Sequence, residues 1–287
     1  MFIRNVLLGL FWFGFVIALM SPFIQLEPIQ QLDSLEEWQQ PSRAAVLNKA
    51  DKKKLLQRLA YTQPLPAKKA LPDFTTFTDT VEKKQAFFAY LRPYVKRENA
   101  RLLSLRTQLL DIIKKHDKGL KITIGEYAFL YSLYDEFRMD VAVSDHESAT
   151  ELLSRVDIIP ESLVLMQAAN ESAWGTSRFA LEGFNFFGQW CFREGCGIVP
   201  SSRQEGESHE VAKFSSPSAS ISSYFYNLNT FHTYQALRDI RLRLRQANKP
   251  LRGETLAEGL GAYSERGDDY IAEISSMIRY NRKFLEQ

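Results

Sequence analysis

Glu171 has the sequence surroundings of a general acid. It stands near the end of a predicted helix that begins at Pro160, with Gln167 four residues before it and Trp174 three residues after it. Because residues three and four apart lie on one face of a helix, we expect these three side chains to be neighbours. A carboxyl group beside an aromatic ring on a largely apolar helix loses hydration, which raises its pKa and lets it hold a proton near neutral pH. The alternative is an exposed Glu171 paired with Arg178.

The elements that must position this carboxyl group are predicted to be mostly helical. Apolar residues recur seven apart from Val81 to Leu109, with Pro93 in the middle, so we expect a kinked helix or two helices packed on the rest of the chain. Further helices are predicted at 124–137, 160–175, 221–228, 235–246, 255–263 and 269–284. Two strands are predicted at 197–203 and 209–214, with a turn at 205–208 between them.

An apolar segment opens the chain. Residues 6–20 carry no charge and, with Phe23 and Ile24, approach the ~20 residues that cross a bilayer. The exit at 18–21 has bulky residues where signal peptidase needs small ones, so an uncleaved anchor is favoured over a cleaved signal peptide. Arg4 precedes the apolar segment and is expected to stay cytoplasmic, which places the remaining chain in the periplasm.

The composition excludes several classes of protein. The 287 residues include 36 Lys and Arg against 34 Asp and Glu, a net charge of +2, which is too balanced for a dedicated nucleic-acid binder. His209-Glu210 lacks the second His of a helical zinc motif, and two cysteines are too few for a four-cysteine site, so we expect no metal and no cofactor.

Cys191 and Cys196 flank a four-residue turn and are expected to form a disulfide in the periplasm. Two free thiols are the alternative.

A basic stripe marks the predicted helix at 235–246. Arg238, Arg241 and Arg245 recur three and four residues apart beside leucines and an isoleucine. This pattern predicts a solvated helix face. A surface that binds acidic peptides is the alternative.

A series of short motifs surrounds and follows Glu171. They are Gln167-Ala-Ala-Asn-Glu171-Ser-Ala-Trp174-Gly175, Asn185-Phe186-Phe187-Gly188, Ala212-Lys213-Phe214, Thr233-Tyr234, Tyr263-Ser264 and Asp269-Tyr270. In this order, over residues 150–285, they resemble the glucosaminidase family of peptidoglycan hydrolases. The resemblance implies an α+β, lysozyme-like fold. A mostly α-helical domain would face a small β-lobe across a substrate groove, with the N-terminal transmembrane anchor before it.

The resemblance also implies an activity and a site. Glu171 would protonate the glycosidic oxygen of the β-1,4 bond between N-acetylglucosamine and N-acetylmuramic acid, as in an endo-β-N-acetylglucosaminidase. The implied substrate-binding residues are Trp174, Asn185, Phe187, Gly188, Tyr263 and Tyr270.

The expected partners are peptidoglycan glycan strands and, through the N-terminal helix, the inner membrane. No nucleic acid is expected, and the protein is expected to be a monomer. The organisation would be an anchor at 1–24, a flexible tether at 25–78, a helical accessory segment at 79–148 and the catalytic domain at 149–287.

The second catalytic carboxylate departs from the family pattern. Relatives carry a Glu on the first strand of the β-lobe, where this chain has Ser202 or Arg203. Glu205, Glu207 and Glu210 lie nearby, and Glu210 is the candidate because it falls within the predicted strand at 209–214. One alternative is attack by the 2-acetamido group of the substrate, which needs no second carboxylate. Two others are a lytic, anhydro-forming muramidase that uses Glu171 alone, and a non-catalytic peptidoglycan-binding scaffold.

Overall fold

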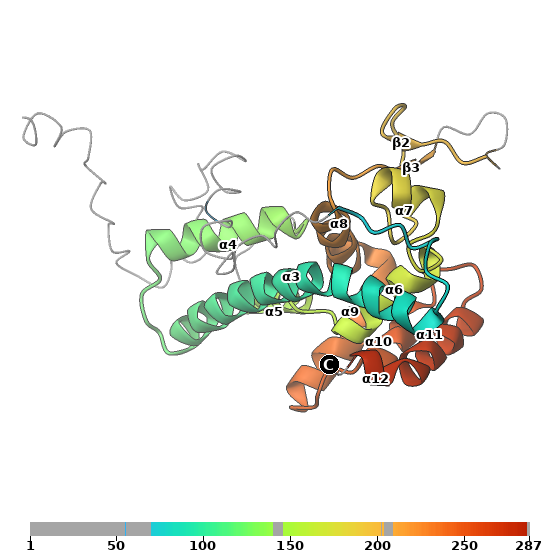
Figure 1. Ribbon diagram of the computed structural model, residues 1–287. Coiled ribbons are helices and arrows are strands. Elements are labelled where there is room, and N and C mark those ends of the chain that lie inside the picture. Colours follow the sequence, from blue (N-terminus) through green and yellow to red (C-terminus); the bar gives the residue numbers. More distant parts are fainter. Residues whose placement is uncertain (1–54, 56–69, 140–145, 202, 204–208, 286–287) are drawn as a thin grey trace, which may run out of the picture.

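The computed structural model describes residues 55, 70–139, 146–201, 203 and 209–285. Helices surround one hydrophobic core, and a small three-stranded sheet lies at one end of them (Figure 1). In chain order the elements are α3 (Thr80–Asp117), α4 (Ile124–Glu136), α5 (His146–Arg155), α6 (Glu161–Glu171), α7 (Arg178–Gly183), β1 (Trp190–Cys191), β2 (Gly197–Ile198), β3 (Glu210–Ala212), α8 (Pro217–Thr230), η3 (His232–Tyr234), α9 (Gln235–Gln246), α10 (Gly253–Ala257), η4 (Glu258–Leu260), α11 (Asp268–Tyr280) and α12 (Arg282–Leu285). This mostly helical fold with a small antiparallel sheet agrees with the α+β, lysozyme-like prediction.

Helix α3 follows the heptad pattern and runs through Pro93 without dividing. The side chain of Asp79 caps its start by accepting a hydrogen bond from the Glu82 amide at 2.8 Å. Of the two predicted alternatives, a kinked helix or two helices, the second is wrong. Pro93 removes only one hydrogen bond, the one to the carbonyl of Ala89. Ala89 is exposed, so water can take the place of that bond. The helix buries four apolar residues spaced by seven: Phe88, Val95, Leu102 and Leu109.

The N-terminal part of the described chain shares its core with the rest. Helix α3 packs against α6 and α8. Phe74 is fully buried, so the structure differs from the expected tether, which would have left residues 70–78 unpacked. Helix α5 was not predicted because its sequence is polar, although Ala149 and Leu152 are buried.

The small sheet has the strand order β1-β3-β2, and both pairs are antiparallel. Strands β2 and β3 occupy the two predicted segments but are shorter, and β1 was too short to give a sequence pattern. Trp190 pairs with Val211, and Cys191 pairs with Glu210. Gly197 pairs with Ala212, and a Cβ at 197 would lie 2.0 Å from the Val211 carbonyl oxygen, so only glycine allows this approach.

The basic stripe of α9 is largely buried. The exposed fraction is 0% for Arg238 and 1% for Arg241, so the predicted solvated face is wrong for both residues. Arg241 donates to the carbonyl oxygens of Ser154, Asp157 and Ile158 at 2.6, 3.3 and 3.0 Å. These carbonyls, at the end of α5 and just beyond it, replace water as acceptors and explain how the guanidinium group is tolerated in the core.

The expected anchor at 1–24 and most of the tether lie outside the described residues. Within the described part of the chain, no helix combines the length and the apolar character that a membrane span requires.

Candidate active site

Glu171 is the last residue of α6, and a left-handed turn follows it. The φ angles of Ala173, Trp174 and Gly175 are 49°, 58° and 79°. Ser172 stabilises this turn, since its hydroxyl oxygen accepts a hydrogen bond from the Gly175 amide at 2.8 Å. The helix therefore ends four residues earlier than predicted, and the expectation that Trp174 shares a helix face with Glu171 is wrong.

Trp174 packs toward α3. Its ring centroid lies 5.7 Å from that of Phe87 and 5.6 Å from that of Phe88, both in edge-to-face geometry. The Nζ of Lys84 lies 4.9 Å from the centroid of the same ring. These contacts give Trp174 a packing role. Its predicted role in substrate binding stays a prediction.

A directed chain of hydrogen bonds ends on the Glu171 carboxyl group. The Tyr224 hydroxyl, from α8, donates to Oε1 of Gln167. The Gln167 amide nitrogen donates to the Tyr270 hydroxyl at 2.9 Å, and that hydroxyl, on α11, donates to Glu171 Oε1 at 2.8 Å. Gln167 is fully buried, so its amide orientation is fixed by these two tyrosines. Three helices thereby hold one carboxyl group in place.

Burial raises the pKa of the Glu171 carboxyl group above its ordinary value, because removal from water disfavours the charged form. Hydrogen bonds donated by Tyr270 and by the side chain of Asn170 lower this pKa in part, whereas the negative charge of Glu273 raises it further. Burial and the nearby Glu171 also raise the pKa of the Tyr270 hydroxyl, which therefore stays protonated as a donor. The pKa values of the Tyr224, Tyr234 and Tyr263 hydroxyl groups are also raised, again mainly by burial.

The two oxygens of Glu171 have different surroundings. Oε1 accepts the Tyr270 bond, while Oε2 faces Gly188, where an added Cβ would lie 3.7 Å from it. Gly188 has φ of 63°, a conformation that favours glycine, and its missing side chain leaves space beside Oε2. A proton on Glu171 is therefore best placed on Oε2, the oxygen that Tyr270 does not occupy.

Asn185 shapes the segment that carries Gly188. Its Nδ2 donates to the carbonyl oxygens of Gln189 and Ala212, both at 2.9 Å, and its Oδ1 accepts from the Gln189 amide at 3.1 Å. The residue is 1% exposed, so its amide is used to join this loop to β3. A role for Asn185 in direct contact with substrate stays a prediction.

Phe187 and Tyr263 also support the loop. The Phe187 ring stacks on Tyr224 with centroids 4.1 Å apart, and the Tyr263 hydroxyl donates to the Phe187 carbonyl at 3.1 Å. The Tyr263 ring stacks on Tyr270 at 5.5 Å. The structure therefore brings Gly188, Tyr263 and Tyr270 together with Glu171. Their predicted role in substrate binding stays a prediction.

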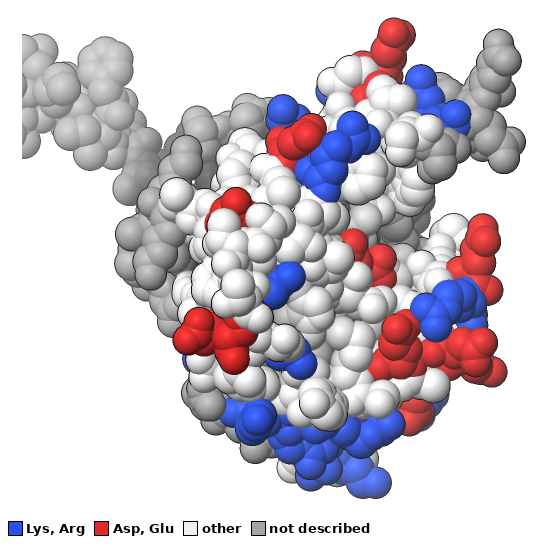
Figure 2. Space-filling model, turned by 45° about the vertical axis from the view of Figure 1, so that its right-hand side comes forward, with Lys and Arg blue, Asp and Glu red and all other residues white. Residues whose placement is uncertain are grey.

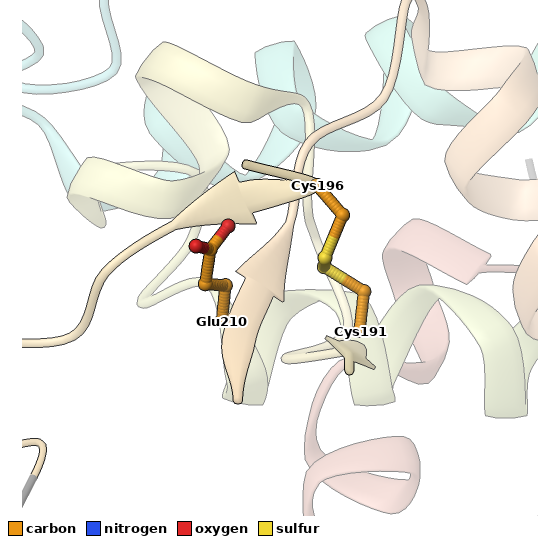
Figure 3. Close-up of side chains that lie close together, drawn as sticks. All are labelled: Cys191, Cys196 and Glu210. Atoms are coloured by element: carbon orange, nitrogen blue, oxygen red, sulfur yellow. A yellow bond between two sulfur atoms is a disulfide. The ribbon is translucent and has the colours of Figure 1, made fainter. Parts of the chain in front are cut away.

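Glu210 lies in the β-lobe beside the Cys191–Cys196 disulfide (Figure 3), whose Cα atoms are 6.3 Å apart. Its two carboxylate oxygens accept hydrogen bonds from the Gly195 and Gly197 amides at 3.0 and 2.7 Å, and the residue is 4% exposed. These backbone bonds lower the pKa of Glu210. The carboxylate is thus buried and bound to the backbone of the disulfide loop. A catalytic role for it stays an untested prediction.

The same loop brings together three side chains of types that can bind a metal ion. Ligand atoms of Cys191, Cys196 and Glu210 lie within 4.8 Å of one another, the spacing of a small metal site. The two sulfurs are bonded to each other, however, so they offer no thiolate to an ion. This arrangement fits a structural clamp better than a metal centre.

The surface is indented on the side that carries the sheet and α11. Figure 2 shows this indentation between an upper part of the molecule and a lower part on which acidic and basic side chains gather. Asp268 and Asp269 are exposed at the start of α11, and Glu273 pairs with Arg266 at 2.7 Å. A polar surface of this kind suits a hydrated polymer better than an apolar ligand.

Fold, site and sequence comparison together define the class of protein. Residues 146–283 match the glucosaminidase family, described as mannosyl-glycoprotein endo-beta-N-acetylglucosaminidase. The chain belongs to the glucosaminidase family of peptidoglycan hydrolases. It is 30% identical over 226 residues to protein bax of Escherichia coli (strain K12), an alignment that covers 78% of this chain and 79% of the relative. No solved structure matches the chain.

Two residues of the hydrogen-bond chain, Gln167 and Tyr224, were not among the predicted site residues. Gln167 stands in the motif around Glu171 and Tyr224 in the predicted helix at 221–228, but the sequence does not show that either side chain is part of the site. The one available signal was the position of Gln167, a polar residue on the largely apolar helix that carries Glu171. The partners of Gln167 lie 57 and 103 residues away along the chain, which no local pattern can reveal.

Proposed function

We propose that this protein is an endo-β-N-acetylglucosaminidase that hydrolyses the bond between N-acetylglucosamine and N-acetylmuramic acid in peptidoglycan, with Glu171 as its general acid. One observation carries this proposal. The Glu171 carboxyl group is partly buried, has a raised pKa, and is held through Oε1 by Tyr270 while Oε2 faces Gly188. A carboxyl group in this state can keep a proton at neutral pH and deliver it from a fixed position.

In the proposed reaction Glu171 acts twice, first as a general acid and then as a general base. Protonated Oε2 of Glu171 gives its proton to the glycosidic oxygen as the bond from that oxygen to the anomeric carbon breaks. The carbonyl oxygen of the substrate's 2-acetamido group bonds to the anomeric carbon and forms an oxazolinium ion. Water then attacks the same carbon, the acetamido group is released, and the Glu171 carboxylate takes up the proton of the water. The engagement of Glu210 with backbone amides supports a route without a second carboxylate.

Digestion of purified sacculi in water enriched in ¹⁸O tests the proposal. Hydrolysis by an endo-glucosaminidase leaves a reducing N-acetylglucosamine end that carries one heavy oxygen. A lytic muramidase would instead leave an anhydro-muramic end without heavy oxygen, because a hydroxyl of the sugar replaces water. Mass spectrometry of the released muropeptides separates these products. Binding of sacculi with no release of either product would show that the protein is a non-catalytic scaffold.

We also propose that residues 1–24 anchor the protein in the inner membrane and that the catalytic region acts in the periplasm as a monomer. The apolar run at 6–20 after Arg4 supports this topology, since a single cation on that side favours a cytoplasmic N-terminus. A C-terminal reporter that is active only after export should give activity in the membrane fraction. Reporter activity in a soluble fraction would indicate that the segment is cleaved, and no activity would contradict export.

A further inference from the structure

The backbone directly after Glu171 is strained. Ala173 and Trp174 have φ of 49° and 58°, a left-handed conformation that side chains with a Cβ rarely adopt. Gly175 continues the turn with φ of 79°. Local bonds include those from the Trp174 amide to the Ala169 carbonyl and from the Gly175 amide to Ser172. Strained residues next to a functional group persist when the surrounding structure holds them.

Aromatic residues from before the matched family region pack on this turn. Phe74 is fully buried against Gly175, where an added Cβ would lie 2.4 Å from Phe74 Cδ2. Phe87 and Phe88 meet the Trp174 ring at centroid distances of 5.7 and 5.6 Å. Phe74 and Phe87 also contact each other at 5.5 Å. Residues upstream of position 146 therefore enclose both Trp174 and Gly175.

The same cluster reaches the loop on the other side of the acid. Phe186 lies 6.4 Å from Phe87 and 6.5 Å from Tyr90 between ring centroids. Two residues later, Gly188 faces Glu171 Oε2. The upstream aromatic cluster thus supports both segments that flank the carboxyl group.

We propose that Phe74 and Phe87 are positioning residues for Glu171, so that the segment before the family region is a working part of the active site. They keep the left-handed turn closed, which fixes the end of α6 and the distance between Glu171 and the Gly188 loop. Loosening the turn would admit water and let the carboxyl group move. This inference rests on the proposed role of Glu171 as general acid.

The test compares two buried positions in the full chain. Phe74→Ala removes the ring that covers the turn, whereas Leu109→Ala removes a fully buried side chain from the far half of α3. We expect Phe74→Ala to lower kcat on purified sacculi about 10- to 100-fold with little change in KM, because small misplacements of a catalytic group have effects of that order. Leu109→Ala should leave both parameters near those of the wild type. Phe74→Leu, which refills most of the volume, should recover most of kcat.

A second readout follows Glu171 itself. The carboxyl carbon signal of Glu171, assigned by its absence in Glu171→Gln, is titrated by NMR in each variant. The midpoint should move toward ordinary glutamate values in Phe74→Ala and stay in place in Leu109→Ala. The other groups that face Glu171 are Tyr224 on α8, Tyr234 on η3, Tyr263, and Tyr270 and Glu273 on α11; none is altered in these variants.

Equal effects of Phe74→Ala and Leu109→Ala on kcat and on the midpoint would overturn the proposal, as would no effect of Phe74→Ala on either. If the wild type releases nothing from sacculi, the proposed function fails by itself, and the NMR midpoints still decide whether the upstream cluster positions Glu171. If Phe74→Ala does not fold, Phe87→Ala takes its place in both measurements, because the Phe87 ring contacts Phe74, Trp174 and Phe186. The same loss of kcat and the same shift of the midpoint are then expected, with Leu109→Ala again as the control.

Discussion

Glu171 is held in surroundings that favour its protonated form, and this preference must appear in protein stability. Its pKa is raised above the ordinary 4.5 in the folded state, mainly by burial. Between the two pKa values the folded state binds more protons than the unfolded state, so stability falls as pH rises through that window. Each pKa unit corresponds to about 1.4 kcal/mol.

Glu171→Gln should therefore be more stable than the wild type at neutral pH and similar to it below pH 4.5. The amide keeps the shape of the protonated acid but never becomes charged. Urea unfolding of both proteins at several pH values measures the difference. Glu194→Gln, at an exposed position in the disulfide loop, serves as the control. A stability gain that is independent of pH would contradict the assignment.

Tyr270→Phe tests the donor that orients Glu171. Loss of its hydrogen bond should raise the pKa of Glu171 further and free the carboxyl group to rotate. A hydrogen bond to a charged group is worth about 1.5–3 kcal/mol, so we expect kcat/KM to fall about 10- to 100-fold. The alkaline limb of the pH–rate profile should move to higher pH. Tyr280→Phe, on the same helix but 78% exposed, should change neither quantity.

At the residue scale, the sequence singled out Glu171 but not the chain of hydrogen bonds that holds it. Glu171 was found because its neighbours form a compact motif, and Gly188 and Tyr270 because they belong to motifs in the same order. The hydrogen-bond partners of Glu210 were not predicted, because a strand assignment does not say which groups contact a side chain. The Gly195 and Gly197 amides that bind it depend on how the disulfide loop folds back on β3.

At the scale of elements, the question is whether Glu210 holds the disulfide loop of the β-lobe in place or takes part in catalysis. The Glu210→Gln variant tests this. We expect Glu210→Gln to reduce activity less than about tenfold, since a general acid or base contributes about 10²–10⁴. Hydrogen exchange of the Gly195 and Gly197 amides should accelerate, because the new side-chain amide cannot accept both of their bonds. A loss of turnover above a hundredfold with unchanged exchange would show that Glu210 is catalytic after all.

The elements themselves could be predicted where their patterns were long. Helix α9 has the predicted bounds of 235–246, and α4 differs from its prediction by one residue. The end of α6 was placed too late because Gly175 is a strong stop signal, whereas the chain already leaves the helix at Ser172. Strand β1, with two residues, is defined by pairing with β3 and has no periodicity of its own.

For the molecule as a whole, Asp157 connects distant parts of the core. It is 1% exposed, and Arg245 contacts its two carboxylate oxygens at 2.7 and 3.0 Å. Arg106 of α3 lies 3.4 Å from the same carboxylate, while Arg241 donates to the Asp157 carbonyl. Burial alone would raise the pKa of Asp157, but the Arg245 hydrogen bond and the charges of Arg241 and Arg106 lower it.

Asp157→Asn should destabilise the protein by about 3–5 kcal/mol at neutral pH, because it leaves buried guanidinium groups without their counter-charge. The Asp157 contribution is present above the ordinary pKa of 3.8 and is lost as pH falls through the lowered folded pKa. The variant and the wild type should therefore become more alike in acid. Urea unfolding measures this, with exposed Asp268→Asn as the control. A pH-independent difference would contradict the charge argument.

The predicted division at residue 149 has no counterpart in the core. Buried residues from Phe74 to Phe284 form one cluster that joins the accessory segment to the family region. Sequence motifs mark the region that carries the chemistry, but packing across α3, α6 and α8 depends on contacts between residues far apart in the chain. Composition and periodicity cannot locate such contacts.

The central claim is that Glu171 is the general acid of a peptidoglycan glycosidase. Wild-type protein and Glu171→Gln are incubated with purified sacculi, and both release of muropeptides and binding to the sacculi are measured. The account predicts release by the wild type, loss of release in Glu171→Gln of about 10²-fold or more, and unchanged binding. Release by Glu171→Gln at the wild-type rate would contradict it.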